Sequence, residues 1–218
     1  MQEMDGKREP EARIYWMDVG VLADAVCFDG HYRMMSPERR KKVNACLFPK
    51  DKRLSLGAGI LFDRGLTDYG LRGREILVAY GENGKPYLPE HPHIHYNLSH
   101  SGGMAMAVFA DAEAGCDVER IRQADMELAE HFFTPQEYAY IAGQRQEMRD
   151  WAFYRLWTLK ESFVKAVGAG LAMALDSFCI TILPDGSIGN CPGPDGTEYE
   201  FWEYGGGGYW AAVCLKRG

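Results

Sequence analysis

Residues 104–122 read MAMAVFADAEAGCDVERIR, a mostly small and apolar stretch that ends in alternating acidic residues. This composition predicts strand structure leading into the acidic end. Successive side chains on a strand point to opposite faces, so Asp117 and Glu119, two residues apart, share one face. The stretch therefore predicts a strand that presents two carboxylates on the same side.

Residues 153–170 read FYRLWTLKESFVKAVGAG and predict a long helix. Glu161 and Lys165 are four residues apart, so they lie on one face of that helix. Alone, such a pair is common on solvated surfaces and weak. Here its neighbours are strongly apolar, which favours a functional role.

If this helix packs beside the acidic strand, three carboxylates and one ammonium converge. Three oxygen ligands, with room left for water and phosphate oxygens, are the usual way in which a protein holds Mg²⁺. Mn²⁺ accepts the same oxygen ligands. A lysine beside such a metal indicates that the substrate is a phosphate ester or anhydride.

Helix and strand signals alternate along the rest of the chain. Helices are predicted to begin at Ser36-Pro37 and Thr134-Pro135, and to cover Leu54–Leu66 and Trp151–Val167, with Asp150 as the cap of the last. Strands are predicted over residues 14–20, 74–80, 94–100, 104–110, 115–121, 177–183, 199–204 and 209–215, with a turn at 101–103. This order predicts an α+β fold in two halves, residues 12–111 and 112–218, preceded by a disordered tail over residues 1–11.

Composition excludes several classes of protein. The net charge of −7 argues against a general nucleic-acid-binding protein, because such proteins are usually basic. No apolar run reaches the roughly 18–20 residues that span a bilayer, and the charged N-terminus lacks the apolar segment of a signal peptide. The six cysteines are scattered without CxxC spacing, which fits a reducing cytoplasm.

Two further segments have the chemistry of anion binding. Residues 97–103, NLSHSGG, combine hydroxyls, an imidazole and glycine backbone N–H groups, all of which donate to anion oxygens. Seven of the 24 Lys and Arg residues lie within residues 39–53 of this otherwise acidic chain. A solvated helix face explains most such clusters, but Arg39 and Lys42 share one face, and the cluster suits a polyanionic ligand.

Together these residues resemble the 4′-phosphopantetheinyl transferase superfamily, and more closely its Sfp-type branch, whose members activate non-ribosomal peptide and polyketide synthetases. The matching stretches are SPERRKK, GKPYLP, YNLSHSGG, AGCDVERIR, HFFTPQEY and FYRLWTLKESFVKAVGAGL. They occur in the family's order and at similar spacing. The resemblance runs from about Ile14 to the C-terminus.

The resemblance implies two similar α+β halves that form a pseudo-dimer within one chain, with the active site in the cleft between them. Because one chain builds the whole cleft, it also implies that the protein is a monomer. It also implies an enzyme that transfers 4′-phosphopantetheine from coenzyme A to a serine of an apo acyl or peptidyl carrier protein. The products would be the holo carrier protein and 3′,5′-ADP, with Mg²⁺ required.

Residue by residue, Asp117, Glu119 and Glu161 match the family's metal ligands, and Lys165 matches the lysine at the pyrophosphate. Other positions match residues of the family that contact the phosphates of coenzyme A. Lys85 matches a lysine at the phosphates of the nucleotide, and Ser99 and His100 match the contact with the 3′-phosphate. The basic residues beside that phosphate are matched by Arg39, Lys42 and Arg53.

The expected catalytic residues are Asp117, Glu161 and Lys165. The lysine would stabilise charge on the leaving group, and Glu161, directly or through a metal-bound water, would take the proton of the carrier serine. Two alternatives stay open. A different Mg²⁺-dependent phosphotransferase or hydrolase would share the carboxylates, although no P-loop sequence is present. A silent coenzyme A-binding module would not need the intact acidic residues and lysine.

Overall fold

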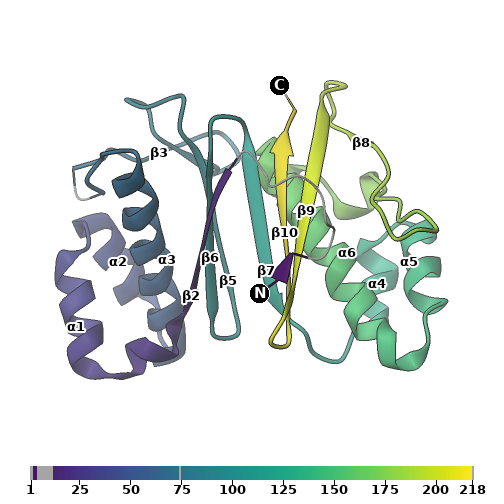
Figure 1. Cartoon of the computed structure of the whole chain (residues 1–218), viewed down its shortest axis with the longest axis horizontal. Helices are drawn as coiled ribbons and strands as arrows, with labels where there is room; N and C mark the ends of the chain where they lie inside the picture. The colour runs from purple at the N-terminus through teal and green to yellow at the C-terminus, as the bar shows by residue number, and fades with distance from the viewer. Residues whose placement is uncertain (1, 4–11, 74, 218) are drawn as a thin grey trace.

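The computed structural model describes residues 2–3, 12–73 and 75–217, and it shows an α+β fold. Two sheets lie side by side between two layers of helix (Figure 1). The first sheet has the order β2-β6-β5, from Ala12–Asp18, Met104–Ala110 and His95–Ser101. The second has the order β1-β9-β10-β7, from Gln2–Glu3, Glu198–Gly206, Tyr209–Lys216 and Ala114–Arg120, and β8, Cys191–Pro192, pairs with β9.

Helices cover the outer face of each sheet (Figure 1). Beside the first sheet lie α1 Ala25–Met34, α2 Pro37–Ala45 and α3 Pro49–Asp68, after the short 3₁₀ helix η1 Val19–Ala23. Beside the second lie α4 Met126–Phe132, α5 Pro135–Ala142 and α6 Gln146–Val167, followed by the 3₁₀ turns η2 Gly170–Ala172 and η3 Leu175–Ser177. A two-stranded hairpin, β3 Ala79–Tyr80 and β4 Pro86–Tyr87, stands apart from both sheets.

The alternation of side chains along β6 shows how the layers are held together. Ala107 and Phe109 belong to the apolar core between the first sheet and its helices. Met106 and Val108 belong to a second core shared with residues of β7 and β10, such as Val213. Both faces of β6 are therefore buried, as expected of a strand without polar alternation. A third core fills the space between α6 and the second sheet.

Most of the predicted elements are confirmed. Ser36 caps α2 by accepting the N–H of Arg39, and Thr134 forms a capping box with Glu137 at the start of α5. Gly168 ends α6 in the left-handed conformation with φ 77°. The two hairpins, β5–β6 and β9–β10, form where the sequence places them.

Three predictions of elements are wrong. Of the strand expected over residues 74–80, residue 74 lies outside the described residues, and within 75–80 only Ala79–Tyr80 form a strand, while Ile76 and Val78 pack against the core. The strand expected over residues 177–183 is reduced to one isolated bridge between Ile182 and Ile188. Helix α6 begins at Gln146, and Asp150 lies inside it.

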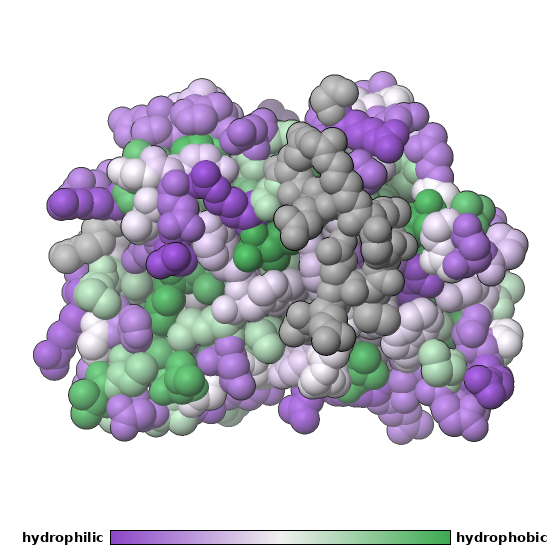
Figure 2. Space-filling model, viewed as in Figure 1, coloured by the Kyte–Doolittle hydropathy of each residue, from purple (hydrophilic) through white to green (hydrophobic). Residues whose placement is uncertain are grey.

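The disorder expected over residues 1–11 does not hold for Gln2–Glu3, which pair with β9. The rest of that prediction, residues 1 and 4–11, lies outside the described residues. In the part of the chain that the structure describes, no helix has the length and apolar character needed to cross a membrane. On the face shown in Figure 2, hydrophilic residues cover much of the outer edge, and hydrophobic residues show between them on the side of α1–α3.

Candidate active site

Helix α6 approaches strand β7 closely because Gly115 has no side chain. A Cβ atom at this position would lie 2.1 Å from the carbonyl oxygen of Ser162, which no real contact allows. The close packing brings Asp117 and Glu119 of β7 next to Glu161 and Lys165 of α6. They line one pocket of about 370 Å³, with Leu98, Ser99, His100 and Trp157.

Lys165 is bonded to the strand rather than to Glu161. Its Nζ donates to Asp117 Oδ1 at 2.6 Å and to the carbonyl of Cys116 at 3.3 Å. Burial lowers the pKa of Lys165, but the Asp117 carboxylate outweighs this effect and leaves the pKa raised. The lysine is therefore held as a cation at the base of the pocket.

The pocket contains more negative than positive charge. Burial raises the pKa of Glu119, and the charge of Asp117 raises it further against the hydrogen bond from Ser101. Burial also raises the pKa of Glu161, with Lys165 opposing and Asp117 reinforcing the shift. One ammonium does not balance three carboxylates, so the pocket favours an added cation.

A buried oxygen of Asp117 supports the fit of a cation. Its Oδ2 is the one buried side-chain oxygen or nitrogen, among the described residues, that lacks a hydrogen-bond partner. An unpaired buried carboxylate oxygen is costly unless a ligand satisfies it. The described residues contain no group of three His, Cys, Asp or Glu side chains already arranged as a metal cage. The fit to a divalent cation thus rests on the three carboxylates, the unpaired oxygen of Asp117 and the excess of negative charge in the pocket.

The resemblance assigns Ser99 to a phosphate contact, and in the structure its hydroxyl faces Asp117. Its hydroxyl donates to Asp117 Oδ1 at 2.8 Å and accepts the N–H of Val118 at 3.3 Å. Its single proton is therefore already used. The side chain is 7% exposed, so it forms part of the wall behind Asp117.

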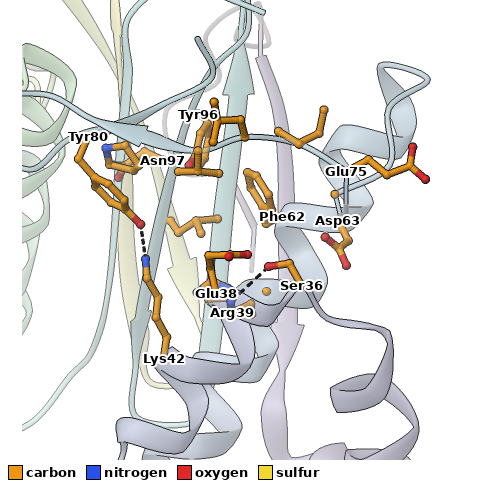
Figure 3. Close-up of a pocket in the computed structure, with 18 of the residues that line it drawn as sticks. Ser36, Glu38, Arg39, Lys42, Phe62, Asp63, Glu75, Tyr80, Tyr96 and Asn97 are labelled. Atoms are coloured by element: carbon orange, nitrogen blue, oxygen red, sulfur yellow. Dashed lines mark hydrogen bonds between the residues drawn. The ribbon is translucent and has the colours of Figure 1, made fainter. Parts of the chain in front are cut away.

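A second pocket, of about 600 Å³, lies between α2, α3 and β5 (Figure 3). Arg39 and Lys42 line it, as predicted from their spacing on one helix face. Burial lowers the pKa of Arg39, although guanidinium remains protonated at neutral pH. Lys42 Nζ donates to the Tyr80 hydroxyl at 2.6 Å, at one side of the pocket in Figure 3.

His100 connects the two pockets. Together with Leu98 it lines both of them. His100 is an exposed residue, yet partial burial of its imidazole lowers its pKa, and the charges of Lys165 and Arg39 lower it further. His100 thus stands where the positive groups of both pockets meet.

Lys85 and Arg53 are not brought to these two pockets. Lys85 lines a third one, of about 320 Å³, where its Nζ donates to Glu113 and, at 2.7 Å, to the carbonyl of Ala166. Its neighbours Gly84 and Pro86 do line the second pocket, so the backbone beside Lys85 reaches it. Arg53 lies half-buried near the N-terminal end of α3 and is not among the residues that line the second pocket.

Sequence reasoning missed three residues of the site region. Tyr80 accepts a hydrogen bond from Lys42, Trp157 lines the first pocket, and Glu113 accepts a hydrogen bond from Lys85. Trp157 had a usable signal, since it lies four residues before Glu161 on α6. Tyr80 and Glu113 are 38 and 28 residues from their lysines, and no local pattern reveals such pairs.

The α+β fold thus places a carboxylate–lysine pocket next to a basic pocket, an arrangement that suits a ligand with more than one phosphate group. Comparison with known proteins makes this specific. Residues 113–214 match the family model described as the 4′-phosphopantetheinyl transferase superfamily. The chain is 34% identical over 170 residues to a 4′-phosphopantetheinyl transferase of Bacillus subtilis, covering 76% of this chain and 75% of that protein. It is 35% identical over 156 residues to 4′-phosphopantetheinyl transferase Sfp of Bacillus subtilis strain 168, covering 71% and 69%.

The chain belongs to the 4′-phosphopantetheinyl transferase superfamily, in the Sfp-type branch, and the predicted resemblance is confirmed. It is therefore an enzyme of the transferase class. Among solved structures, the ACPS–CoA complex of Chronobacterium ammoniagenes aligns with 48% of this chain and 95% of its own, at 20% identity and a TM-score of 0.40. That likeness concerns about half of the chain.

Proposed function

We propose that this protein transfers the 4′-phosphopantetheine group of coenzyme A to a serine of an apo acyl or peptidyl carrier protein, in the presence of Mg²⁺. The serine Oγ forms a bond to the β-phosphorus, which carries the pantetheine arm. The bond from that phosphorus to the bridging pyrophosphate oxygen breaks, and 3′,5′-ADP leaves. The names of the relatives support this reaction, which would serve non-ribosomal peptide, polyketide or fatty acid synthesis.

The observation that carries the proposal is the shared wall of the two pockets, Leu98 and His100. Coenzyme A has a nucleotide with a 3′-phosphate at one end of its polar part and a pyrophosphate at the other. A basic pocket adjoining a carboxylate–lysine pocket suits one molecule that spans both. A ligand with a single phosphate would leave one of them unused.

The Mg²⁺, or Mn²⁺, would be held by Asp117, Glu119 and Glu161, because their pocket has an excess of negative charge and Asp117 Oδ2 has no hydrogen-bond partner. When bound, the metal would supply positive charge that stabilises the negative charge developing on the departing 3′,5′-ADP. Lys165 adds a fixed ammonium at the same place, held there by Asp117. Glu161, which lines the same pocket, would accept the serine proton.

The second pocket would bind the nucleotide end. Arg39, Lys42 and His100 bind the 3′-phosphate, and Arg53 adds charge near the N-terminal end of α3. Lys85 reaches the phosphates only by exchanging its bond to Glu113 for one to the ligand. The contacts to the 3′-phosphate are equal in ground and transition states, so their loss should raise KM for coenzyme A more than it lowers kcat, whereas Lys85 would add charge stabilisation at the leaving group.

We further propose that residues 12–111 and 112–218 are two similar halves forming a pseudo-dimer in one chain, with the active site in the cleft between them. Its support is the mirrored order of layers, helices and sheet on each side (Figure 1). A cleft built within one chain suits a monomer. The six cysteines, all free, suit the cytoplasm, and the acidic chain suits neither nucleic acid nor a membrane as partner.

The test is mass spectrometry of an apo carrier protein incubated with this protein, coenzyme A and Mg²⁺, with an EDTA control. We expect a metal-dependent gain of one phosphopantetheine on the carrier serine. Asp117→Ala should abolish the gain, whereas Lys42→Ala should slow it only at low coenzyme A. Near-normal turnover of Asp117→Ala in Mg²⁺ would refute the metal assignment, and no gain with any carrier would refute the activity.

A further inference from the structure

Strands β5 and β7 lie edge to edge without a backbone ladder between them. In the described part of the chain, β5 pairs with β6 and β7 pairs with β10. Side-chain oxygens at alternate positions of β5 instead accept the N–H groups at alternate positions of β7. These bonds join Asn97 to Cys116 at 3.1 Å, Ser99 to Val118 at 3.3 Å, and Ser101 to Arg120 at 3.3 Å.

The two serines do more than the asparagine, because each also donates its proton to a carboxylate. Ser99 donates to Asp117 Oδ1 at 2.8 Å, and Ser101 donates to Glu119 Oε2. Each serine therefore contacts a carboxylate and the N–H of the following residue at once. These two contacts hold the strand and orient the acid, and the Ser99 hydroxyl also accepts a bond from Lys165 Nζ at 3.5 Å.

This arrangement decides which oxygen of Asp117 stays available. Oδ1 accepts the Ser99 hydroxyl and the Lys165 ammonium, and Oδ2 is left without a partner. Hydrogen bonds that orient ligating carboxylates are part of how proteins tune a metal site. A hydroxyl has one proton to donate, so Ser99 cannot also donate to a substrate phosphate without releasing Asp117.

We propose that Ser99 and Ser101 are positioning residues that hold Asp117 and Glu119 in the orientation needed to bind the divalent cation. This rests on the proposed function of the same site, and it assigns the serines to the cation rather than to the 3′-phosphate. Asn97 also accepts an N–H of β7 along this polar seam, the row of bonds from Asn97, Ser99 and Ser101 to β7, but it holds no carboxylate. It is therefore the matched control.

The test measures Mn²⁺ affinity by electron paramagnetic resonance, without substrate. Ser99→Ala and Ser101→Ala should each weaken Mn²⁺ binding by about 10-fold or more, the usual effect of losing an orienting partner. Ser101→Thr and Ser101→Val have nearly the same shape and differ in the hydroxyl, so Thr should retain affinity and Val should lose it. Asn97→Ala should lower the midpoint of thermal unfolding but leave Mn²⁺ affinity unchanged.

Coenzyme A binding in EDTA separates this role from a phosphate contact. The serine variants should bind coenzyme A as the unaltered protein does, whereas His100→Ala should bind it more weakly. Loss of coenzyme A affinity in Ser99→Ala, with unchanged Mn²⁺ affinity, would overturn the proposal while leaving the transferase function intact. If the unaltered protein neither binds Mn²⁺ nor modifies a carrier, the proposed function itself fails.

Discussion

Two adjacent residues of α6 have opposite roles because a helix turns by about 100° per residue. Glu161 faces the carboxylate pocket, whereas Lys160 is fully buried in the core of the second sheet. Lys160 Nζ donates to both oxygens of Glu137 at 2.7 and 2.8 Å and to the carbonyl of Phe178 at 2.6 Å. Glu137 also accepts the N–H of Ile180, so one ion pair joins α5, α6 and the segment after η3.

Glu137→Gln should be strongly destabilising. Burial already lowers the pKa of Lys160, and the neutral amide would leave its ammonium without a counter-charge. Breaking a buried pair in this way costs about 3–5 kcal/mol, measured as the loss of unfolding free energy in urea. The exposed pair Arg217–Glu198 is the control, since Glu198→Gln should cost less than about 1 kcal/mol. Equal losses in the two variants would contradict this account.

At the scale of elements, the β3–β4 hairpin is fastened to the C-terminal end of α6. Asn83 Nδ2 donates to the carbonyl of Gly168 at 3.3 Å, and Lys85 donates to that of Ala166. Carbonyls at a helix C-terminus lack partners within the helix, and a lysine there is favourable. The hairpin also lines the second pocket through Gly84 and Pro86, so its attachment positions the proposed nucleotide site.

Gly170→Ala should loosen this attachment. Gly170 has φ 53°, and a Cβ there would lie 2.8 Å from the carbonyl oxygen of Asn83. We expect a loss of about 1–3 kcal/mol in stability and a raised KM for coenzyme A with little change in kcat. Gly196→Ala is the control, because its φ of 79° imposes similar strain in open space, far in sequence from the hairpin. A KM that rises equally in both variants would show that the hairpin attachment is not responsible.

The elements that the sequence predicts well are those fixed by local rules. Caps at Ser36 and Thr134 and the glycine stop at Gly168 depend on neighbours within a few residues. The failures are decided by distant partners. Asp150 resembles a cap, but its carboxylate accepts the N–H of Ala124 at 2.8 Å, 26 residues away, and α6 extends past it. Residues 177–183 have the composition of a strand, yet Ile180 and Ile182 pack into the core beside α6.

The same distinction holds for the candidate site. Spacing on one strand and one helix was enough to group Asp117, Glu119, Glu161 and Lys165. Spacing says nothing about which acid a lysine will contact, and here Lys165 bonds to Asp117 and Lys85 to Glu113. Likewise, the local sequence predicts that the Ser99 hydroxyl is free to bind an anion, because its partners Asp117 and Val118 on β7 are 18 and 19 residues away.

At the scale of the whole molecule, the candidate site draws on both sheets and both helical layers. Arg39 and Lys42 come from α2, His100 from β5, Asp117 from β7 and Lys165 from α6. The first sheet and the second contact each other through an apolar core and the polar seam between β5 and β7. A ligand that spans the two pockets would therefore bind only when these parts are assembled.

Coenzyme A and Mg²⁺ together should raise the thermal unfolding midpoint more than either does alone. A ligand present at 100 times its Kd stabilises the folded state by about 2.7 kcal/mol, which for a chain of this size corresponds to roughly 5–10 °C. Differential scanning fluorimetry with each ligand and with both measures this increment. Asp117→Asn should keep the shift from coenzyme A and lose the extra shift from Mg²⁺, because the basic pocket is intact and the orphaned carboxylate oxygen is gone. Lys42→Ala should reduce the coenzyme A shift and keep any shift from Mg²⁺ alone. If both variants lose the same part of the shift, the two pockets do not have the separate roles assigned to them here.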